Sequence, residues 1–258
     1  MKDIRILTIG DIVGKAGRNI LASRLPGIID RERIDLVIAN GENSAGGMSM
    51  TPEVTRELFS RGIDVITSGN HIWNNSDILQ ILDSDLNLLR PANYPSEVSG
   101  KGHCIVNYRG LNVCVINLMG RILMSTIDCP FRKFDEIYSR IKKDADVIIV
   151  DFHAEATSEK QALGWYVDGR ASAVFGTHTH VQTSDERILP HGTGFITDIG
   201  MTGAFDSVIG MKTEKSIRFF LSQTKIKFET ADANPGINGA VFTINNSGKT
   251  VSVKRIKE

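Results

Sequence analysis

Short apolar runs rich in β-branched residues alternate with segments of helical period along most of the chain. The runs that predict strands are 4–12, 34–40, 63–68, 146–152 and 172–175. The segments that predict helices are 19–33, 51–62, 130–143 and 158–166. Thr51 comes directly before a proline, as a helix N-cap often does. Such alternation is typical of parallel βαβ units, in which helices cover both faces of the sheet.

The middle and the last third of the chain depart from this alternation. Residues 103–108 and 111–118 flank an Arg-Gly pair and predict an antiparallel hairpin. A strand at 194–198 and a helix near 214–222 are followed by two or three strands, the last pair joined by a turn at 246–248. We therefore expect an α/β fold with a mixed sheet, or a pair of sheets, and with helices on the outside.

Length, charge and cysteine content limit the classes to which the chain can belong. A chain of 258 residues fits one domain spanning 1–258. It can bury about three quarters of its unfolded surface, so a bound metal would serve chemistry and not bulk stability. Thirty basic residues balance thirty acidic ones, which argues against an extended nucleic-acid partner or a membrane surface. The three cysteines form no Cys-x-x-Cys pair, and we see no signal peptide or membrane span, so we expect a cytoplasmic protein.

Residue types that bind metals follow five predicted strands, at the point where each strand ends. They are Asp11, then Glu42 and Asn43, then Asn70 and His71, then His153, and finally His178 and His180. Parallel strands bring their carboxyl ends to one edge of a sheet, which is where open α/β sheets bind ligands. The sequence therefore predicts that these side chains share one site.

Each of these residues has an ordinary structural explanation when taken alone. An aspartate or asparagine after a strand usually caps a turn or a helix, and a lone buried histidine is usually a hydrogen-bonded core residue. The pair His178 and His180 on one short loop is harder to explain as core packing. Five independent strand ends that all carry ligand types favour a functional site over five coincidences.

The chemistry of these side chains also indicates a class of metal. Imidazole, carboxylate and amide groups without a thiolate suit manganese, iron or zinc in a reactive site, and not a structural zinc cage. Two divalent ions about 3.5 to 4 Å apart need a bridging group, and Glu42 is the best-placed carboxylate. Because Asp11 and Glu42 are the only formal negative charges in the set, two such ions would keep a positive excess that attracts phosphate.

Longer motifs resemble those of a known family. The order GD, GEN, GNH, a mid-chain histidine and GTHTH is similar to that of the calcineurin-like metallophosphoesterases. The segments NGEN, GNHIW, RPANYP, DFHAEATSEK, ALGWYVDGRASAVFGTHTHVQT and ITDIGMTG resemble the YmdB-like bacterial phosphodiesterases more closely. The resemblance covers nearly the whole chain. It implies a four-layer α/β sandwich and a dinuclear centre that hydrolyses phosphodiesters, with 2′,3′-cyclic AMP as the expected model substrate.

The resemblance also implies a role for each site residue. One metal would be held by Asp11, Glu42, Asn43 and His180. Glu42 would bridge to a second metal, held by Asn70, His153 and His178. The segment GDIV lacks the Asp-x-His of the wider superfamily, and Asn43 would take the place of the missing histidine. Iron or manganese is the metal we expect, in divalent or mixed-valence form, with zinc left open.

The mechanism that we expect places His71 beside substrate. The metal ions would clamp the phosphate and present a hydroxide for in-line attack, while His71 protonates the departing ribose oxygen. No residue is assigned to substrate binding. Several aromatic side chains could stack on a base, and several arginines could contact phosphate. Packing and ion pairing are the default explanations for these residues. The residues are Trp73, Tyr94, Trp165, Arg90, Arg121 and Arg170.

Two rival functions stay open at this level. One is a phosphomonoesterase, nucleotidase or nuclease that uses the same centre. The other is a regulatory protein that senses a nucleotide or a metal and hydrolyses phosphoesters only incidentally. The expected partner is a small phosphodiester or cyclic nucleotide, and whether the chain forms a homo-oligomer is left open.

Overall fold

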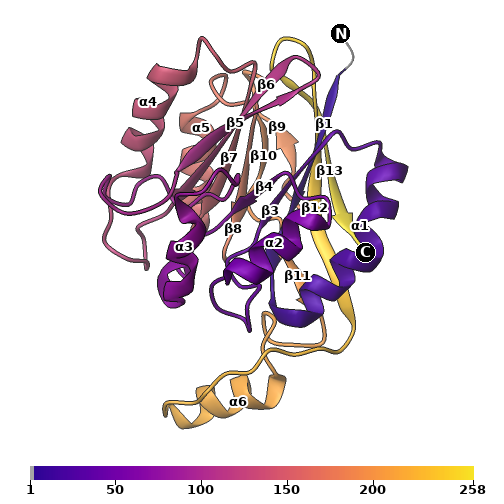
Figure 1. Ribbon diagram of the computed structural model, residues 1–258, viewed down its shortest axis with the longest axis vertical. Helices are drawn as coiled ribbons and strands as arrows, with labels where there is room; N and C mark the ends of the chain where they lie inside the picture. Colours follow the sequence, from indigo (N-terminus) through magenta and orange to yellow (C-terminus); the bar gives the residue numbers. More distant parts are fainter. Residues whose placement is uncertain (1–2) are drawn as a thin grey trace.

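A computed structural model describes residues 3–258 as two β-sheets packed face to face, with helices on the outer faces (Figure 1). The first sheet has the order β2-β11-β12-β1-β3-β4, and β13 also pairs with β12. Its strands are β1 (Ile4–Ile9), β2 (Asp11–Ile12), β3 (Leu36–Asn40), β4 (Val65–Thr67), β11 (Met201–Ala204), β12 (Pro235–Ile244) and β13 (Thr250–Lys257). Within it β1, β3 and β4 are parallel, whereas β12 runs antiparallel to β1.

The second sheet has the order β5-β6-β7-β8-β10-β9. Its strands are β5 (His103–Tyr108), β6 (Leu111–Met119), β7 (Val147–His153), β8 (Ala173–Thr177), β9 (Arg187–Ile188) and β10 (Gly194–Ile196). The strands β6, β7, β8 and β10 are parallel, and β5 and β9 are antiparallel edge strands. Both sheets are therefore mixed, as expected.

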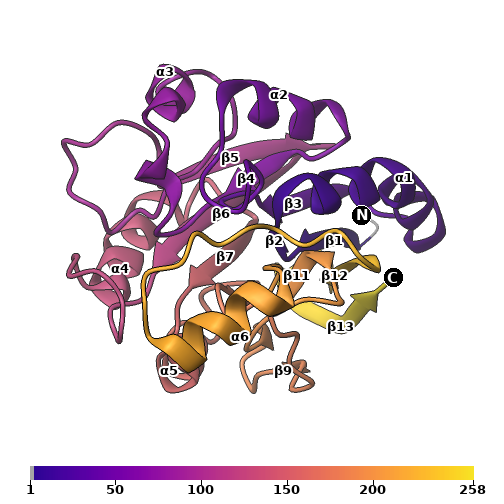
Figure 2. The same cartoon turned by 90° about the horizontal axis from the view of Figure 1, so that it is seen from below.

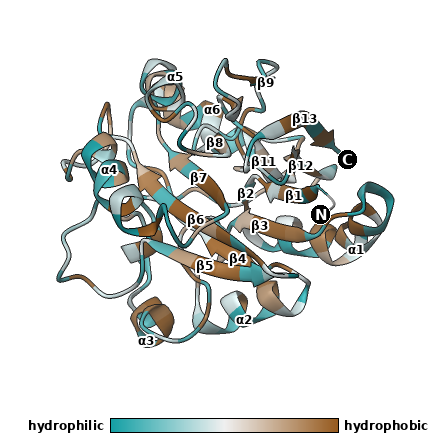
Figure 3. Ribbon diagram, turned by 90° about the horizontal axis from the view of Figure 1, so that it is seen from above, coloured by the Kyte–Doolittle hydropathy of each residue, from teal (hydrophilic) through white to brown (hydrophobic). Residues whose placement is uncertain are grey.

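Helices flank this pair of sheets (Figures 1 and 3). They are α1 (Gly14–Glu32), α2 (Pro52–Ser60), α3 (Leu79–Leu82), α4 (Pro130–Ile141), α5 (Thr157–Tyr166) and α6 (Thr213–Ser222), with 3-10 turns η1 (Ile72–Asn74) and η2 (Ser76–Ile78). Seen from below in Figure 2, α6 and the chain that leaves it lie in front of the sandwich. None of the helices among residues 3–258 combines the length and the apolar composition that crossing a bilayer requires.

Alternation along the central strands divides the apolar residues into three layers. In β1, Ile4 and Ile6 face the other sheet, whereas Leu7 and Ile9 pack under the helices. In β7 the residues facing the other sheet alternate with residues that pack on α4 and α5. Strands buried on both faces read as continuous apolar runs, which explains the pattern in the sequence. The result is the predicted four-layer α/β sandwich, with brown apolar strands at its centre in Figure 3.

Most of the predicted elements are confirmed to within a few residues, including the 103–118 hairpin and the 246–248 turn. The predicted N-cap is confirmed as well, since Thr51 Oγ1 accepts from Val54 N at 3.2 Å. Two predictions were wrong in detail. The strand predicted at 4–12 is interrupted at Gly10, where the chain passes so close to the Gly200 carbonyl that no side chain would fit. The helix predicted from residue 19 begins at Gly14. The assignment of 1–258 to a single domain stays a prediction.

Candidate metal centre

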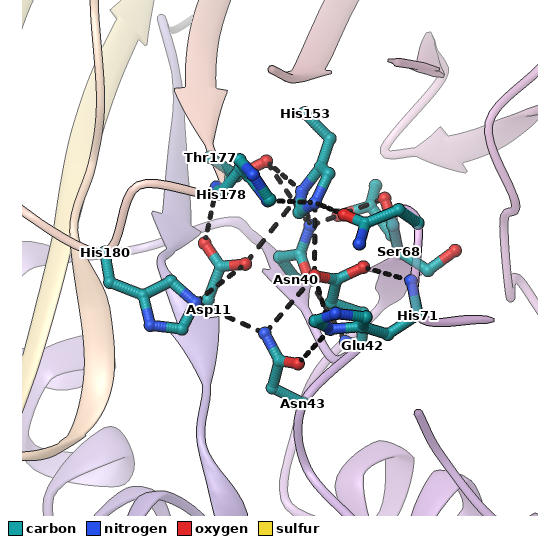
Figure 4. A network of polar contacts seen from close by, with 12 residues as sticks. Asp11, Asn40, Glu42, Asn43, Ser68, His71, His153, Thr177, His178 and His180 are labelled. Carbon is teal, nitrogen blue, oxygen red and sulfur yellow. Dashed lines mark hydrogen bonds and ion pairs between the residues drawn. The ribbon is translucent and has the colours of Figure 1, made fainter. Parts of the chain in front are cut away.

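The strand ends of the two sheets meet at one edge and bring all eight predicted site residues together. Asp11 follows β1, as predicted, and begins the two-residue strand β2, which pairs with β11. His153 is the last residue of β7, and the other residues follow β3, β4 and β8, as predicted. Figure 4 shows side chains from these loops pointing toward a common centre.

Glu42, His153 and His178 form the tightest group, with their candidate ligand atoms within 4.8 Å of one another. His153 Nε2 lies 3.1 Å from Glu42 Oε1 and 3.1 Å from His178 Nδ1. Asn70 Oδ1 lies 3.0 Å from the same His153 nitrogen. Two imidazole nitrogens, a carboxylate and an amide oxygen thus converge, which is a donor set suited to a divalent transition metal.

Asp11, Asn43 and His180 lie on the other side of Glu42. His180 Nε2 lies 3.7 Å from Asp11 Oδ1 and 3.2 Å from Asn43 Nδ2. Asp11 is fully buried, and its Oδ1 has no hydrogen-bond partner within residues 3–258. A buried carboxylate oxygen without a partner is costly, and a cation is the group that would satisfy it.

The histidines are held so that one ring nitrogen of each faces the centre. His153 Nδ1 lies 2.9 Å from Thr177 Oγ1, and His180 Nδ1 lies 2.9 Å from the Ile209 carbonyl. His178 Nε2 lies 3.2 Å from the Glu155 carboxylate. Acceptors on the outer nitrogens of metal-binding histidines fix the ring and its tautomer. The geometry of these residues therefore fits a metal centre.

The Asn43 amide is placed differently from what the predicted ligand role requires. Its nitrogen faces Glu42 and His180, and its oxygen lies 2.8 Å from His71 Nδ1. An amide oxygen has two lone pairs, so in the orientation seen it can accept from a protonated His71 Nδ1 and keep a lone pair for a metal ion.

The charges of the site hold its carboxylates ionised. Burial would raise the pKa of Asp11, but the neighbouring His180 and His153 hold it well below its usual range. Burial likewise opposes ionisation of Glu42, and the charge of His153 lowers its pKa. Burial would lower the pKa of His180, yet Asp11 raises it to about 9. Burial and the charge of His153 lower the pKa of His178 to about 3.

A buried polar layer, which we did not predict, lies behind His153. Thr177 Oγ1 donates to Asp151 Oδ1 at 2.8 Å, and Asn40 Nδ2 donates to Asp151 Oδ2 at 3.3 Å. Burial raises the pKa of Asp151 to about 7. The Asn40 side chain also accepts from Glu42 N at 3.2 Å. The signal in the sequence was a polar residue that interrupts an apolar run just before a strand end, as in VIIVDFH.

The loop that carries His178 and His180 has an unusual backbone and a buried anchor. Both histidines have positive φ, 92° and 64°, which is uncommon for residues other than glycine. Between them, Thr179 donates from its Oγ1 to Asp198 Oδ2 at 2.6 Å. Lys160 Nζ lies 2.7 Å from the same oxygen, and both members of this ion pair are buried. No pattern in the sequence predicted this pair.

Two cavities adjoin the centre. One, of about 270 Å³, is lined by Met48, His71 and Glu155 together with His178 and His180. The other, of about 370 Å³, is lined by Asn70 and by Leu123, which is almost fully exposed. The site is therefore open to a ligand that is larger than a metal ion.

The aromatic and arginine candidates have structural partners. Trp73 packs edge-on against Tyr94, with ring centroids 5.4 Å apart, and the Arg187 guanidinium lies over Trp165. The other contacts of this set are Arg90 with the carbonyls of Pro91, Val98 and Ser99, Arg170 with Asp135, and Arg121 with Cys129. The default explanation, packing and hydrogen bonding, accounts for these side chains.

Comparison with known proteins shows that the likeness covers almost the whole chain. Residues 7–256 match the family described as YmdB-like protein. A 2′,3′-cyclic-nucleotide 2′-phosphodiesterase of Bacillus subtilis is 45% identical over 254 residues, which cover 98% of this chain and 96% of that protein. The crystal structure of a hypothetical protein from Thermus thermophilus matches with a TM-score of 0.93 and 39% identity, over 99% of both chains. That of a phosphatase from Mycoplasma pneumoniae matches with a TM-score of 0.94 and 35% identity, over 100% of this chain and 94% of the other.

Proposed function

The chain belongs to the YmdB-like protein family, and we propose that it is a dinuclear metal-dependent phosphodiesterase that hydrolyses small 2′,3′-cyclic nucleotides. The observation that carries this proposal is the buried Asp11 oxygen without a partner, which faces a converging set of carboxylate, amide and imidazole groups. The similarity to the 2′,3′-cyclic-nucleotide 2′-phosphodiesterase of Bacillus subtilis supports the substrate class.

Two groups of ligands would share Glu42. Asp11, Glu42, Asn43 and His180 would hold one ion. Asn70, His153 and His178, with Glu42, would hold the other. The 3.1 Å contact between Glu42 and His153, and the 3.2 Å contact between Glu42 and Asn43, support the bridging position. Iron or manganese suits these donors, and zinc is a third candidate.

When bound, the metal ions would supply Lewis-acid stabilisation of the phosphate charge and would lower the pKa of a coordinated water. The reaction adds water to phosphorus and breaks the bond to the ribose 2′ oxygen, so that oxygen must gain a proton. His71 is suited to donate it. Its side chain is 29% exposed and lines the cavity of about 270 Å³, and its Nδ1 is engaged by Asn43. This leaves Nε2 to face a substrate in the cavity.

The test is hydrolysis of 2′,3′-cyclic AMP by metal-stripped protein that has been reloaded with manganese or iron. We expect turnover in the parent and a loss of about 10²- to 10⁴-fold in His71→Ala with two metal equivalents retained. His191→Ala is the matched control, because His191 is exposed and pairs with Asp168 outside the site. Full activity in His71→Ala, beside an inactive Asp11→Ala, would refute the role of His71.

A phosphomonoesterase is the second candidate function, because the similar Mycoplasma pneumoniae structure is described as a phosphatase. Adenosine 2′- and 3′-monophosphates, assayed beside the cyclic nucleotide, separate the two. Release of inorganic phosphate from the monoesters at a higher kcat/KM than ring opening would favour this second candidate.

A further inference from the structure

A third cavity, of about 360 Å³, is lined by His180 but not by His71. His180 and Ile209 line both this cavity and the one that contains His71, so the two adjoin at these residues. We call the third cavity the distal groove. Its volume lies within the range of pockets that bind small ligands. Nothing in the proposed hydrolysis of a cyclic mononucleotide uses it.

Strand pairing places the floor of the distal groove next to the metal centre. The Asn238 carbonyl accepts from Gly10 N at 3.0 Å, and Gly10 directly precedes the predicted ligand Asp11. Asn238 is paired across the sheet with Lys257. Gln182 Nε2 donates to the carbonyls of neighbouring strands β12 and β13, at 2.9 and 3.0 Å, and so holds the chain after His180 along one side of the groove.

The polar groups of the distal groove are incompletely paired. Asn238 is 8% exposed, and its Oδ1 has no hydrogen-bond partner in the described part of the chain. Lys257 forms no ion pair within residues 3–258. Arg255 uses only its Nε for Glu186, at 2.8 Å, which leaves its remaining N–H groups available. The nearby acid Glu258 pairs with Arg31. Two cations and a buried hydrogen-bond acceptor therefore line the distal groove, which adjoins the proposed metal centre at His180.

We propose that the distal groove binds a second phosphate of the substrate, so that the preferred substrate is a short oligoribonucleotide, or a 5′-phosphorylated nucleotide, that ends in a 2′,3′-cyclic phosphate. Arg255 and Lys257 recognise the 5′ phosphate while the cyclic phosphate lies at the metal centre. Asn238 Oδ1 accepts from a ribose hydroxyl or base amine. Two local cations on a chain of zero net charge fit one extra phosphate and not a long nucleic acid. This inference rests on the proposed function.

Binding of product-like nucleotides to the manganese-loaded protein tests the groove without turnover. Isothermal titration calorimetry compares adenosine 3′-phosphate with adenosine 3′,5′-bisphosphate, which differs only by the 5′ phosphate. Charge-assisted contacts to that phosphate should make the bisphosphate bind about tenfold tighter or more. The double variant Arg255→Gln/Lys257→Gln should bind both ligands equally, and its affinity for the monophosphate should stay within about twofold of the parent.

The matched control is Lys142→Gln/Lys249→Gln. This variant also removes two positive charges, but at a separate small cavity that Lys142 and Lys249 line. Lys249 directly precedes the first residue of β13, whereas Lys257 is the last residue of that strand. This control should keep the preference for the bisphosphate. Equal affinities in the parent, or a preference that survives in Arg255→Gln/Lys257→Gln, would overturn the inference. If the preference is present but 2′,3′-cyclic AMP is not hydrolysed with any metal, the proposed reaction fails and the phosphate site stands.

Discussion

Two buried charged clusters lie on either side of the 178–180 loop, and they differ in how completely their polar groups are paired. Toward one side, His178 and His180 face Asp11 and Glu42, and a carboxylate oxygen there has no hydrogen-bond partner among residues 3–258. Figure 4 shows this first cluster. Toward the other side, Thr179 faces Asp198.

The second cluster is complete. Asp198 Oδ2 accepts from Lys160 Nζ and Thr179 Oγ1, and Asp198 Oδ1 accepts from Gly200 N at 2.7 Å. Burial raises the pKa of Asp198, and the charge of Lys160 opposes that rise. The contrast teaches that a buried cluster with open acceptors is suited to bind an ion, whereas a closed one fixes the backbone that presents the ligands.

The largest expected effect comes from removing the charge of Asp11, whose Oδ1 has no hydrogen-bond partner among residues 3–258. Asp11→Asn keeps the shape of the side chain but removes a negative charge from the metal centre. We expect kcat/KM to fall by about a thousandfold or more, since electrostatic stabilisation of the reacting phosphate is lost. Differential scanning calorimetry should also show that added manganese raises the Tm of the parent and raises that of the variant much less. An unchanged metal-dependent rise in Tm would exclude Asp11 as a ligand.

A steric change sharpens the comparison without altering charge. Gly69 lies against the open cluster, and an added Cβ would come within 2.2 Å of the His153 ring and 2.4 Å of Glu42 Oε2. Gly69→Ala should therefore displace both groups and lower activity by about a hundredfold. Gly27→Ala is the control, because no atom lies within 4 Å of its Cβ position in α1. The control should keep full activity and gain about 0.5–1 kcal/mol of stability. Equal activity in both variants would contradict this arrangement of the centre.

Breaking the closed cluster should separate stability from metal affinity. Lys160→Met or Asp198→Leu alone leaves a buried charge unpaired and should lower the free energy of unfolding by about 3–5 kcal/mol. The double variant should recover most of that stability, because it removes both charges. It should still bind manganese about 10- to 100-fold more weakly, since Thr179 has lost its acceptor and the backbone of the two histidines is no longer held. Recovery of both properties would show that the pair has no role in positioning the ligands.

Local patterns in the sequence predicted the mixed α/β architecture and the eight side chains of the candidate site, and the family resemblance added the four layers. Apolar residues at consecutive positions of β3 and β7 indicated strands buried on both faces, and polar residues at the strand ends indicated the edge where ligands bind. The break at Gly10 was missed, since Gly10 lies against Gly200 and the two residues after it pair with β11. No local pattern near residue 10 reports on a segment almost two hundred residues away.

By itself, then, the sequence determined the fold class, the family and the set of residues that we propose as metal ligands. Only the tertiary structure decided how these residues meet: the contact of Asp11 with His178 joins positions 167 residues apart, and the packing of two separate sheets sets it. The pairing of Lys160 with Asp198, the support of His153 by Thr177 and the distal groove between Asn238 and Lys257 have the same origin. Each depends on the relative placement of elements, which is fixed by burial and register over the whole chain and not by the residues adjacent in sequence.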